Sequence, residues 1–145
     1  MAPTGNVPGI LEQFSTLQAP ALTAMAGTHH GELIGGGLTQ TAALVMQAPT
    51  AIRGWCGKRF DTDGQGMNLV RRGGQIAESA PIQLVTDDSH IDGRSVLRVV
   101  YSSGALRLLC DELRQLDPDT VLGIGMLNLA GRWIPAFPFL LHRQA

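Results

Sequence analysis

Turn signals recur at short intervals from Thr50 onward, and this spacing of turns limits the fold more than any other feature of the chain. Paired Gly, Asp and Pro residues form tight turns, and the apolar runs between them are too short for ordinary capped helices. The signals are Asp63-Gly64, Gly73-Gly74, Asp92-Gly93, Ser103-Gly104, Asp117-Pro118-Asp119 and Ala130-Gly131. The runs between them, rich in Val, Ile, Leu and aromatic residues, include 82–86, 95–101, 120–129 and 133–142. We expect roughly six to eight antiparallel strands.

Two segments carry helical spacing. In residues 8–17 the apolar side chains recur at helical intervals and Pro20 ends the run, which predicts a short N-terminal helix. Residues 105–116 fit a strand and a helix alike, since their leucines also repeat at helical intervals and Arg107 stands four residues before Asp111. The strand is favoured because both flanking segments look like hairpin partners.

This many short strands avoid exposed edges most economically by closing into a barrel. The expected fold is therefore mainly β: a small antiparallel β-barrel, lipocalin-like or calycin-like, with a short N-terminal helix. We expect one domain over 1–145, with a helical lead at 1–20 and a strand-rich core at 50–143. Charged residues make up only 16% of the chain, which indicates a large core or an apolar cavity.

Composition argues against several classes of partner. The net charge is −1 and the cations are spread along the chain, so neither nucleic acid nor an anionic membrane is expected to bind. No apolar run is long enough to span a membrane as a helix. Cys56 and Cys110 form no C-x-x-C pair and the chain starts without a leader pattern, which favours a cytoplasmic protein with reduced thiols. A homodimer is possible.

No cofactor is expected. The sequence lacks G-x-S-x-G, H-E-x-x-H, a P-loop lysine and a complete G-x-G-x-x-G fingerprint. Gly123-Ile124-Gly125 lies inside an apolar run, so close packing or a bend in a strand explains it better than dinucleotide binding.

The histidine pair His29-His30, with Glu32 nearby, has three readings: a metal site, an acid or base at a pocket mouth, and a solvated loop. Adjacent residues on a strand point to opposite faces, so both rings can meet one ion only from a loop. No metal is therefore expected, and both histidines remain candidates for proton transfer.

The stretch Gly54-Trp55-Cys56-Gly57-Lys58-Arg59-Phe60-Asp61 combines a large aromatic, two glycines and two cations. It resembles a run found in the G-x-W-x-G-motif domain family of small bacterial proteins. The C-terminal third resembles that family's partner domain, through Tyr101, Asp111, Arg114, 120–123 and 138–143. The resemblance covers about half of the chain. It implies a β-rich fold and brings no settled reaction.

The defining motif of that family is altered here. In Gly35-Gly36-Gly37-Leu38-Thr39, Gly37 occupies the tryptophan position and Thr39 that of the final glycine. The loss of an inward-facing tryptophan leaves unfilled volume, which suggests a ligand pocket. The alternative is that Met25, Met46 or a shifted loop fills the space.

Asp111 and Glu112 are carboxylates among apolar residues, and a strand points one of them inward. If Asp111 shares the face of its neighbouring leucines, burial makes it a candidate general acid or base, unless an arginine holds it as a structural ion pair. Arg114 falls on the opposite face of a regular strand, so Arg98 and Arg107 are equally open as partners.

Three aromatic residues complete the candidate site. Tyr101 ends an apolar strand, which suits either an anchor with its hydroxyl at the rim or a proton donor. Trp55 and Trp133 are interpreted as core or as pocket wall. We place Trp55 on the inner wall and expect the neighbouring cations of Lys58 and Arg59 to reach solvent.

The functional hypothesis is a barrel that encloses an apolar small molecule and promotes a cofactor-independent cyclisation, isomerisation or proton transfer, as in secondary metabolism. The assigned catalytic residues are Asp111, Tyr101, His29 and His30. The assigned ligand contacts are Trp55, Arg114 and Trp133. The alternatives are a non-catalytic carrier or sensor of a hydrophobic ligand and a fully packed structural module.

Overall fold

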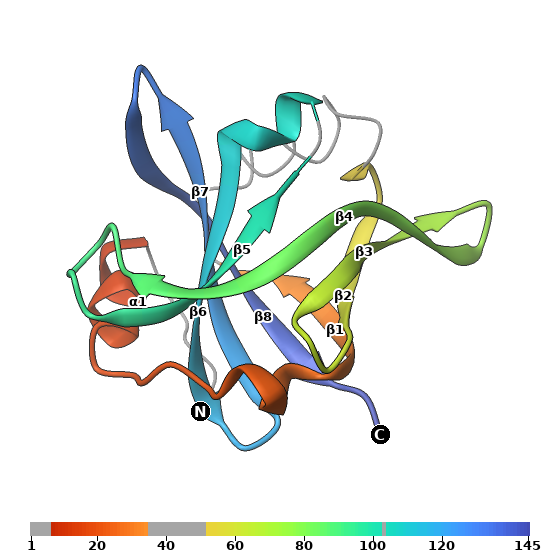
Figure 1. Ribbon diagram of the computed structural model, residues 1–145, viewed down its shortest axis with the longest axis horizontal. Coiled ribbons are helices and arrows are strands. Elements are labelled where there is room, and N and C mark those ends of the chain that lie inside the picture. Colours follow the sequence, from red (N-terminus) through yellow and green to blue (C-terminus); the bar gives the residue numbers. More distant parts are fainter. Residues whose placement is uncertain (1–6, 35–51, 103) are drawn as a thin grey trace.

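The computed structural model describes residues 7–34, 52–102 and 104–145, and in them eight antiparallel strands close into one barrel (Figure 1). Each strand pairs with the next along the chain, and β8 closes the barrel by pairing with β1. The predicted closed antiparallel β-barrel is confirmed. The elements are α1 (Val7–Phe14), η1 (Leu22–Met25), β1 (Gly27–Leu33), β2 (Trp55–Phe60), β3 (Gln65–Arg72), β4 (Gln75–Asp88), β5 (Ser95–Tyr101), η4 (Gly104–Leu108), β6 (Leu109–Asp117), β7 (Thr120–Leu129) and β8 (Arg132–Arg143).

Within the described residues, the turn signals lie between consecutive strands. Gly73 and Gly74 join β3 to β4 with φ angles of 58° and 80°, a conformation that glycine adopts without strain. The ambiguous segment 105–116 begins in the short 3₁₀ helix η4 and continues as β6, so the strand interpretation is confirmed from Leu109 onward.

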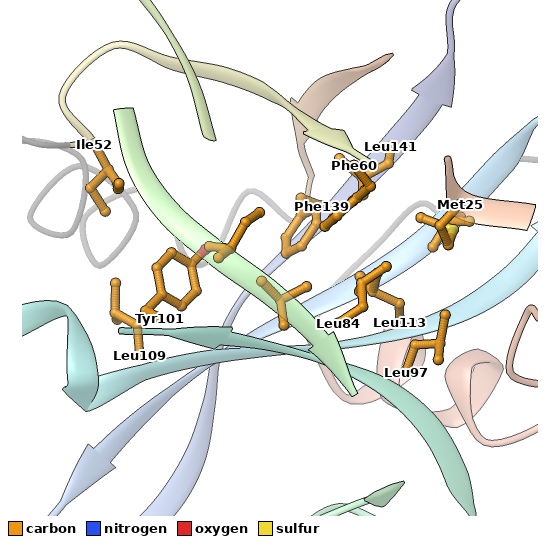
Figure 2. Packing of buried hydrophobic residues seen from close by; sticks show 14 of the residues in the cluster. Met25, Ile52, Phe60, Leu84, Leu97, Tyr101, Leu109, Leu113, Phe139 and Leu141 are labelled. Carbon is orange, nitrogen blue, oxygen red and sulfur yellow. The ribbon is translucent and has the colours of Figure 1, made fainter. Parts of the chain in front are cut away.

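The inner core fills the barrel between its two ends. Figure 2 shows Ile52, Tyr101 and Leu109 on one side of this core and Met25, Leu97 and Leu113 on the other. Met25 comes from η1 and is 1% exposed, so this short helix closes one end of the barrel.

A second core lies on the outer face of the barrel, under α1. Ile10 and Phe14 of α1 are buried against apolar side chains of β5, β6, β7 and β8, namely Val96, Cys110, Leu122, Ile124, Met126 and Leu140. Figure 1 shows α1 beside the loop between β4 and β5. Arg114 fixes this contact: it donates to the carbonyl oxygen of Phe14 at 3.1 Å and pairs through both terminal nitrogens with Asp92.

Two of the four register shifts between paired strands in the described residues determine which side chains near the cavity face inward. The pairing of β2 with β3 shifts between Trp55 and Gly57, and that of β7 with β8 shifts between Gly125 and Met126. A bulge inserts one residue and so reverses the alternation of faces beyond it. No helix among the described residues is long and apolar enough to cross a membrane.

Candidate functional site

Four polar side chains meet inside the barrel, at the end opposite η1. Lys58 Nζ donates to Asn68 Oδ1 at 2.7 Å and to the Tyr101 hydroxyl at 2.7 Å, and it lies 3.1 Å from Asp111 Oδ2. The Tyr101 hydroxyl donates to the same Asp111 oxygen at 2.8 Å. The exposed fractions are 1% for Lys58, 0% for Asn68 and Asp111, and 7% for Tyr101. The result is a buried ion pair held by two neutral partners.

Strand register explains why these residues meet. Lys58 on β2 is the cross-strand partner of Asn68 on β3, and Asp111 on β6 is the partner of Val99 on β5. Cross-strand partners share a face, and residues two apart on one strand share it too. Tyr101 therefore follows Val99 on the inner face, diagonal to Asp111.

A cavity of about 20 Å³ adjoins this network. Its polar wall is formed by Lys58, Tyr101 and Asp111, and its apolar wall by Leu33, Ile52, Trp55, Leu109, Phe137 and Phe139. Leu33 is 39% exposed, so the wall extends to the surface at this end of the barrel. A water molecule needs roughly 10–15 Å³, so the space admits about one group of that size. We call it the Asp111 cavity.

One residue that lines this cavity carries an unsatisfied acceptor. Asp111 Oδ1 is fully buried and has no hydrogen-bond partner among the described residues. A buried polar atom without a partner loses its solvation with no compensation, at a cost of about 1–3 kcal/mol. Such an atom beside a cavity is therefore ready to accept a hydrogen bond or a proton from a bound molecule.

Burial sets the protonation behaviour of two members of the network. Desolvation lowers the pKa of Lys58 below its usual value, and the neighbouring charge of Asp111 opposes this only in part. Burial and the negative charge of Asp111 raise the pKa of Tyr101 well above 10, so its hydroxyl keeps its proton at neutral pH. Tyr101 is thus a permanent donor beside an amine that releases its proton more easily than usual.

Glycines make room for the aromatic wall. A Cβ atom on Gly31 would lie 2.3 Å from the Trp55 ring, and a Cβ atom on Gly125 would lie 2.2 Å from the Phe137 ring. A Cβ atom on Gly123 would likewise lie 2.3 Å from the Phe139 ring. The Gly123-Ile124-Gly125 stretch is therefore explained by close packing, as expected from its apolar context.

The structure shows that Asp111, and not Glu112, points inward, which the sequence left open, and it corrects the expected partner of Asp111. Leu109, Asp111 and Leu113 share the inner face, and Glu112 points outward to the Ser89 hydroxyl, the His90 amide and Arg98. The cation beside Asp111 is Lys58, whereas an arginine was expected. Lys58 does not reach solvent, contrary to prediction, because the bulge in β2 turns both it and Trp55 inward.

Two of the predicted ligand contacts lie elsewhere. Arg114 pairs with Asp92 on the outer face, as the three-residue offset from Asp111 requires on a regular strand, and it does not line the cavity. Trp133 lies beyond the bulge in β8, where it packs against the outer core and stacks on His90 at 5.6 Å between ring centroids. Trp55 does line the cavity, and its indole nitrogen donates to Asn68 Oδ1 at 3.1 Å.

The two histidines lie on β1 and face opposite ways. His29 is buried near η1, with Nε2 at 2.9 Å from the Met25 carbonyl oxygen, and burial lowers its pKa. His30 is exposed and stacks on His142 with ring centroids 6.4 Å apart. Neither ring lines the Asp111 cavity, so the structure does not bring the two histidines together with Asp111 and Tyr101.

Lys58 and Asn68 are the site residues that sequence reasoning missed. One signal was present: Lys58 is the only lysine in a chain whose other ten cationic side chains are all arginine. Asn68 carried no signal, since it lies among ordinary strand residues. The altered Gly35–Thr39 motif and Met46 lie outside the described residues.

Comparisons with known proteins add a fold relative. No protein-family model matches the chain, and no curated protein matches it. A solved structure described as "Crystal structure of protein from Thermomonospora curvata" superposes with a TM-score of 0.75 at 19% identity, covering 97% of this chain and 90% of that one. At this identity the likeness shows a shared fold alone, and the resemblance to the G-x-W-x-G-motif family stays a prediction.

Proposed function

We propose that the barrel binds a small, mainly apolar molecule in the Asp111 cavity and exchanges a proton with it through Asp111. The observation that carries this proposal is the fully buried Oδ1 atom of Asp111, which has no partner among the described residues and belongs to a residue that lines the cavity. Aromatic and aliphatic side chains form most of the remaining wall, as in ligand sites generally. An apolar ligand with one acidic C–H or polar hydrogen fits this arrangement.

The residues around Asp111 have complementary roles in such a reaction. Asp111 acts as the base, while the Tyr101 hydroxyl and the Lys58 ammonium stabilise negative charge that develops on the ligand. Trp55 and Phe139 keep water away from the transferred proton. This set supports cofactor-independent isomerisation, cyclisation or proton transfer.

Nitroethane in D₂O is a suitable probe, because it is small, its α-proton is acidic, and it has no carbonyl group with which an amine could condense. We expect the protein to accelerate exchange of the α-proton above the rate in buffer, measured by proton NMR. Asp111→Asn should lower the accelerated rate roughly 10²-fold, because asparagine cannot take up the proton.

Glu112→Gln is the matched control. Glu112 is equally buried and adjacent in sequence, but it lies on the outer face and does not line the cavity. This variant should exchange nitroethane protons at the wild-type rate, at temperatures where circular dichroism shows it folded. An Asp111→Asn protein that keeps the wild-type rate contradicts the proposed role of Asp111.

A second candidate, a non-catalytic carrier, is favoured by a different observation: each of the three protons on the Lys58 ammonium has an acceptor, so the cation of the ion pair is satisfied. A carrier binds without proton exchange. The two indole N–H signals separate these cases, since Trp55 lines the cavity and Trp133 does not. A nitroethane titration that shifts only the Trp55 signal, with no accelerated exchange, assigns the barrel as a carrier.

A further inference from the structure

Lys58 lines the Asp111 cavity between a carboxylate and a phenol, and we propose that it forms an imine with a small aldehyde or ketone. This inference rests on the proposed function only in using the same cavity. It adds a covalent step at a different atom and names carbonyl compounds as the class of ligand.

The choice of lysine at this position is the first argument. The chain uses arginine for every other cationic side chain, and Lys58, its only lysine, is 1% exposed. Arginine retains its charge under all ordinary conditions and makes more hydrogen bonds, so it suits a purely structural buried ion pair better. A lysine can lose its proton and become a nucleophile.

The geometry around Nζ supplies the groups that imine formation needs. Asp111 Oδ2 lies 3.1 Å away and can take the ammonium proton, which leaves a neutral amine and a neutral acid. The Tyr101 hydroxyl, 2.7 Å from Nζ, can donate to the oxygen of a bound carbonyl group. Asn68 Oδ1, also 2.7 Å from Nζ, accepts an N–H and orients the amine.

The electrostatics of the site also favour formation of an imine. Burial lowers the pKa of Lys58 despite the presence of Asp111, so the neutral amine is more accessible than at a surface lysine. Three aromatic rings surround Nζ, with the centroids of Tyr101, Trp55 and Phe139 at 4.9, 5.4 and 5.9 Å. They limit access of water, which would otherwise hydrolyse the imine.

The step balances without a redox partner. After proton transfer to Asp111, the Nζ lone pair forms a bond to the carbonyl carbon, and the carbonyl oxygen is protonated to give a carbinolamine. The carbinolamine hydroxyl then leaves as water and a C=N bond forms. The two remaining N–H protons of the neutral amine and the carbonyl oxygen make up this water, so no electrons are exchanged with another molecule.

The size of the cavity limits the substrate. About 20 Å³ accommodates a carbonyl group beside Nζ, while the remainder of the molecule must extend along the apolar wall toward the exposed Leu33. Unbranched small aldehydes satisfy this requirement better than ring systems. Propanal is therefore the probe.

The experiment treats the folded protein with propanal and cyanoborohydride, which reduces an imine to a stable secondary amine. Mass spectrometry then reads one added propyl group on the intact chain. Trypsin does not cut at an alkylated lysine, so peptide 54–59, released by cleavage at Arg53 and Arg59, identifies the adduct at Lys58. An adduct at the N-terminal amine appears in a different peptide.

The chain unfolded in urea is the reference, because there Lys58 is an ordinary exposed lysine. We expect Lys58 in the folded protein to be alkylated at least about tenfold faster, since the cavity holds the carbonyl group next to the amine. An equal or slower rate in the folded protein overturns the inference. The nitroethane measurement is independent of this result, because nitroethane forms no imine.

Lys58→Arg gives the second control, since it keeps the cation beside Asp111 and removes the nucleophile. Trapping in the peptides that contain position 58 should vanish, while trapping at the N-terminus continues. Tyr101→Phe keeps the ring and removes the proton donor, and it should slow alkylation of the folded protein roughly tenfold or more. Folded Tyr101→Phe protein that reacts at the wild-type rate refutes the assigned mechanism.

Discussion

Removing the whole polar network tests whether the fold needs it. The triple variant Lys58→Met, Asp111→Leu and Tyr101→Phe replaces the ion pair and its hydroxyl by apolar groups of comparable shape. We expect its free energy of unfolding to lie within about 2 kcal/mol of wild type, or above it, because apolar replacement of a buried ion pair is often neutral or stabilising by about 1–4 kcal/mol.

The magnitude follows from the partners that each variant leaves behind. Lys58→Met alone leaves the carboxylate of Asp111, which is 0% exposed, buried without a cation. This variant should lose about 3–5 kcal/mol in free energy of unfolding. Adding Asp111→Leu removes the unpaired carboxylate. Only the Tyr101 hydroxyl then lacks its two partners, at a cost of about 1–3 kcal/mol. Tyr101→Phe removes that hydroxyl. Asn68 keeps its bonds to Trp55 and to the carbonyl oxygen of Ala80.

Urea unfolding followed by tryptophan fluorescence measures these differences, provided that the variants share one m-value. The additional volume of leucine over aspartate has the adjoining cavity to occupy. A triple variant destabilised by more than about 4 kcal/mol refutes the reasoning, because the network would then be explained by stability alone. A stable triple variant that neither exchanges nitroethane protons nor traps propanal shows that the network is retained for chemistry.

Two further predictions concern the scaffold around the site. Hydrogen bonding to Arg114 lowers the pKa of Asp92 to about 2, so this pair stabilises the native state above the ordinary carboxyl range, and its contribution is lost as pH falls from about 4 through about 2. Asp92→Asn should therefore reduce the melting temperature at pH 7, as measured by calorimetry. The melting temperature of the variant should also depend less on pH between about 4 and about 2, and an unchanged pH dependence in this range contradicts the prediction. Gly125→Ala places a methyl group against the Phe137 ring and should cost about 1–3 kcal/mol in urea unfolding, whereas wild-type stability would show that the ring can move aside.

The two proposals about Asp111 and Lys58 depend on one physical circumstance, a low-dielectric interior that contains both charges. In such surroundings proton transfer between an ammonium and a carboxylate is less costly than in water, because both charged forms lose solvation. The resting ion pair and a reactive neutral pair are thus two states of the same site. Nitroethane reports on the carboxylate, and propanal reports on the amine.

The sequence by itself determined the β class, the barrel and the approximate positions of β5, β7 and β8. Glycine pairs such as Gly73-Gly74 mark reversals through backbone conformations that few other residues adopt, and apolar runs between them are too short for helices. Alternation along β6 also assigned Asp111 and Arg114 to opposite faces correctly, since β6 is regular from Leu109 through Arg114.

Only the tertiary structure decided which side chains form the site. Trp55 and Lys58 are three residues apart, so strict alternation places them on opposite faces, and the bulge between Trp55 and Gly57 brings both to the cavity. The bulge near Gly125 turns Trp133 outward in the same way. Bulges and cross-strand register arise from pairing between strands, which the residue pattern within one strand does not encode. For that reason the ion pair between Lys58 and Asp111, which are 53 positions apart in the sequence, appears only in the closed barrel.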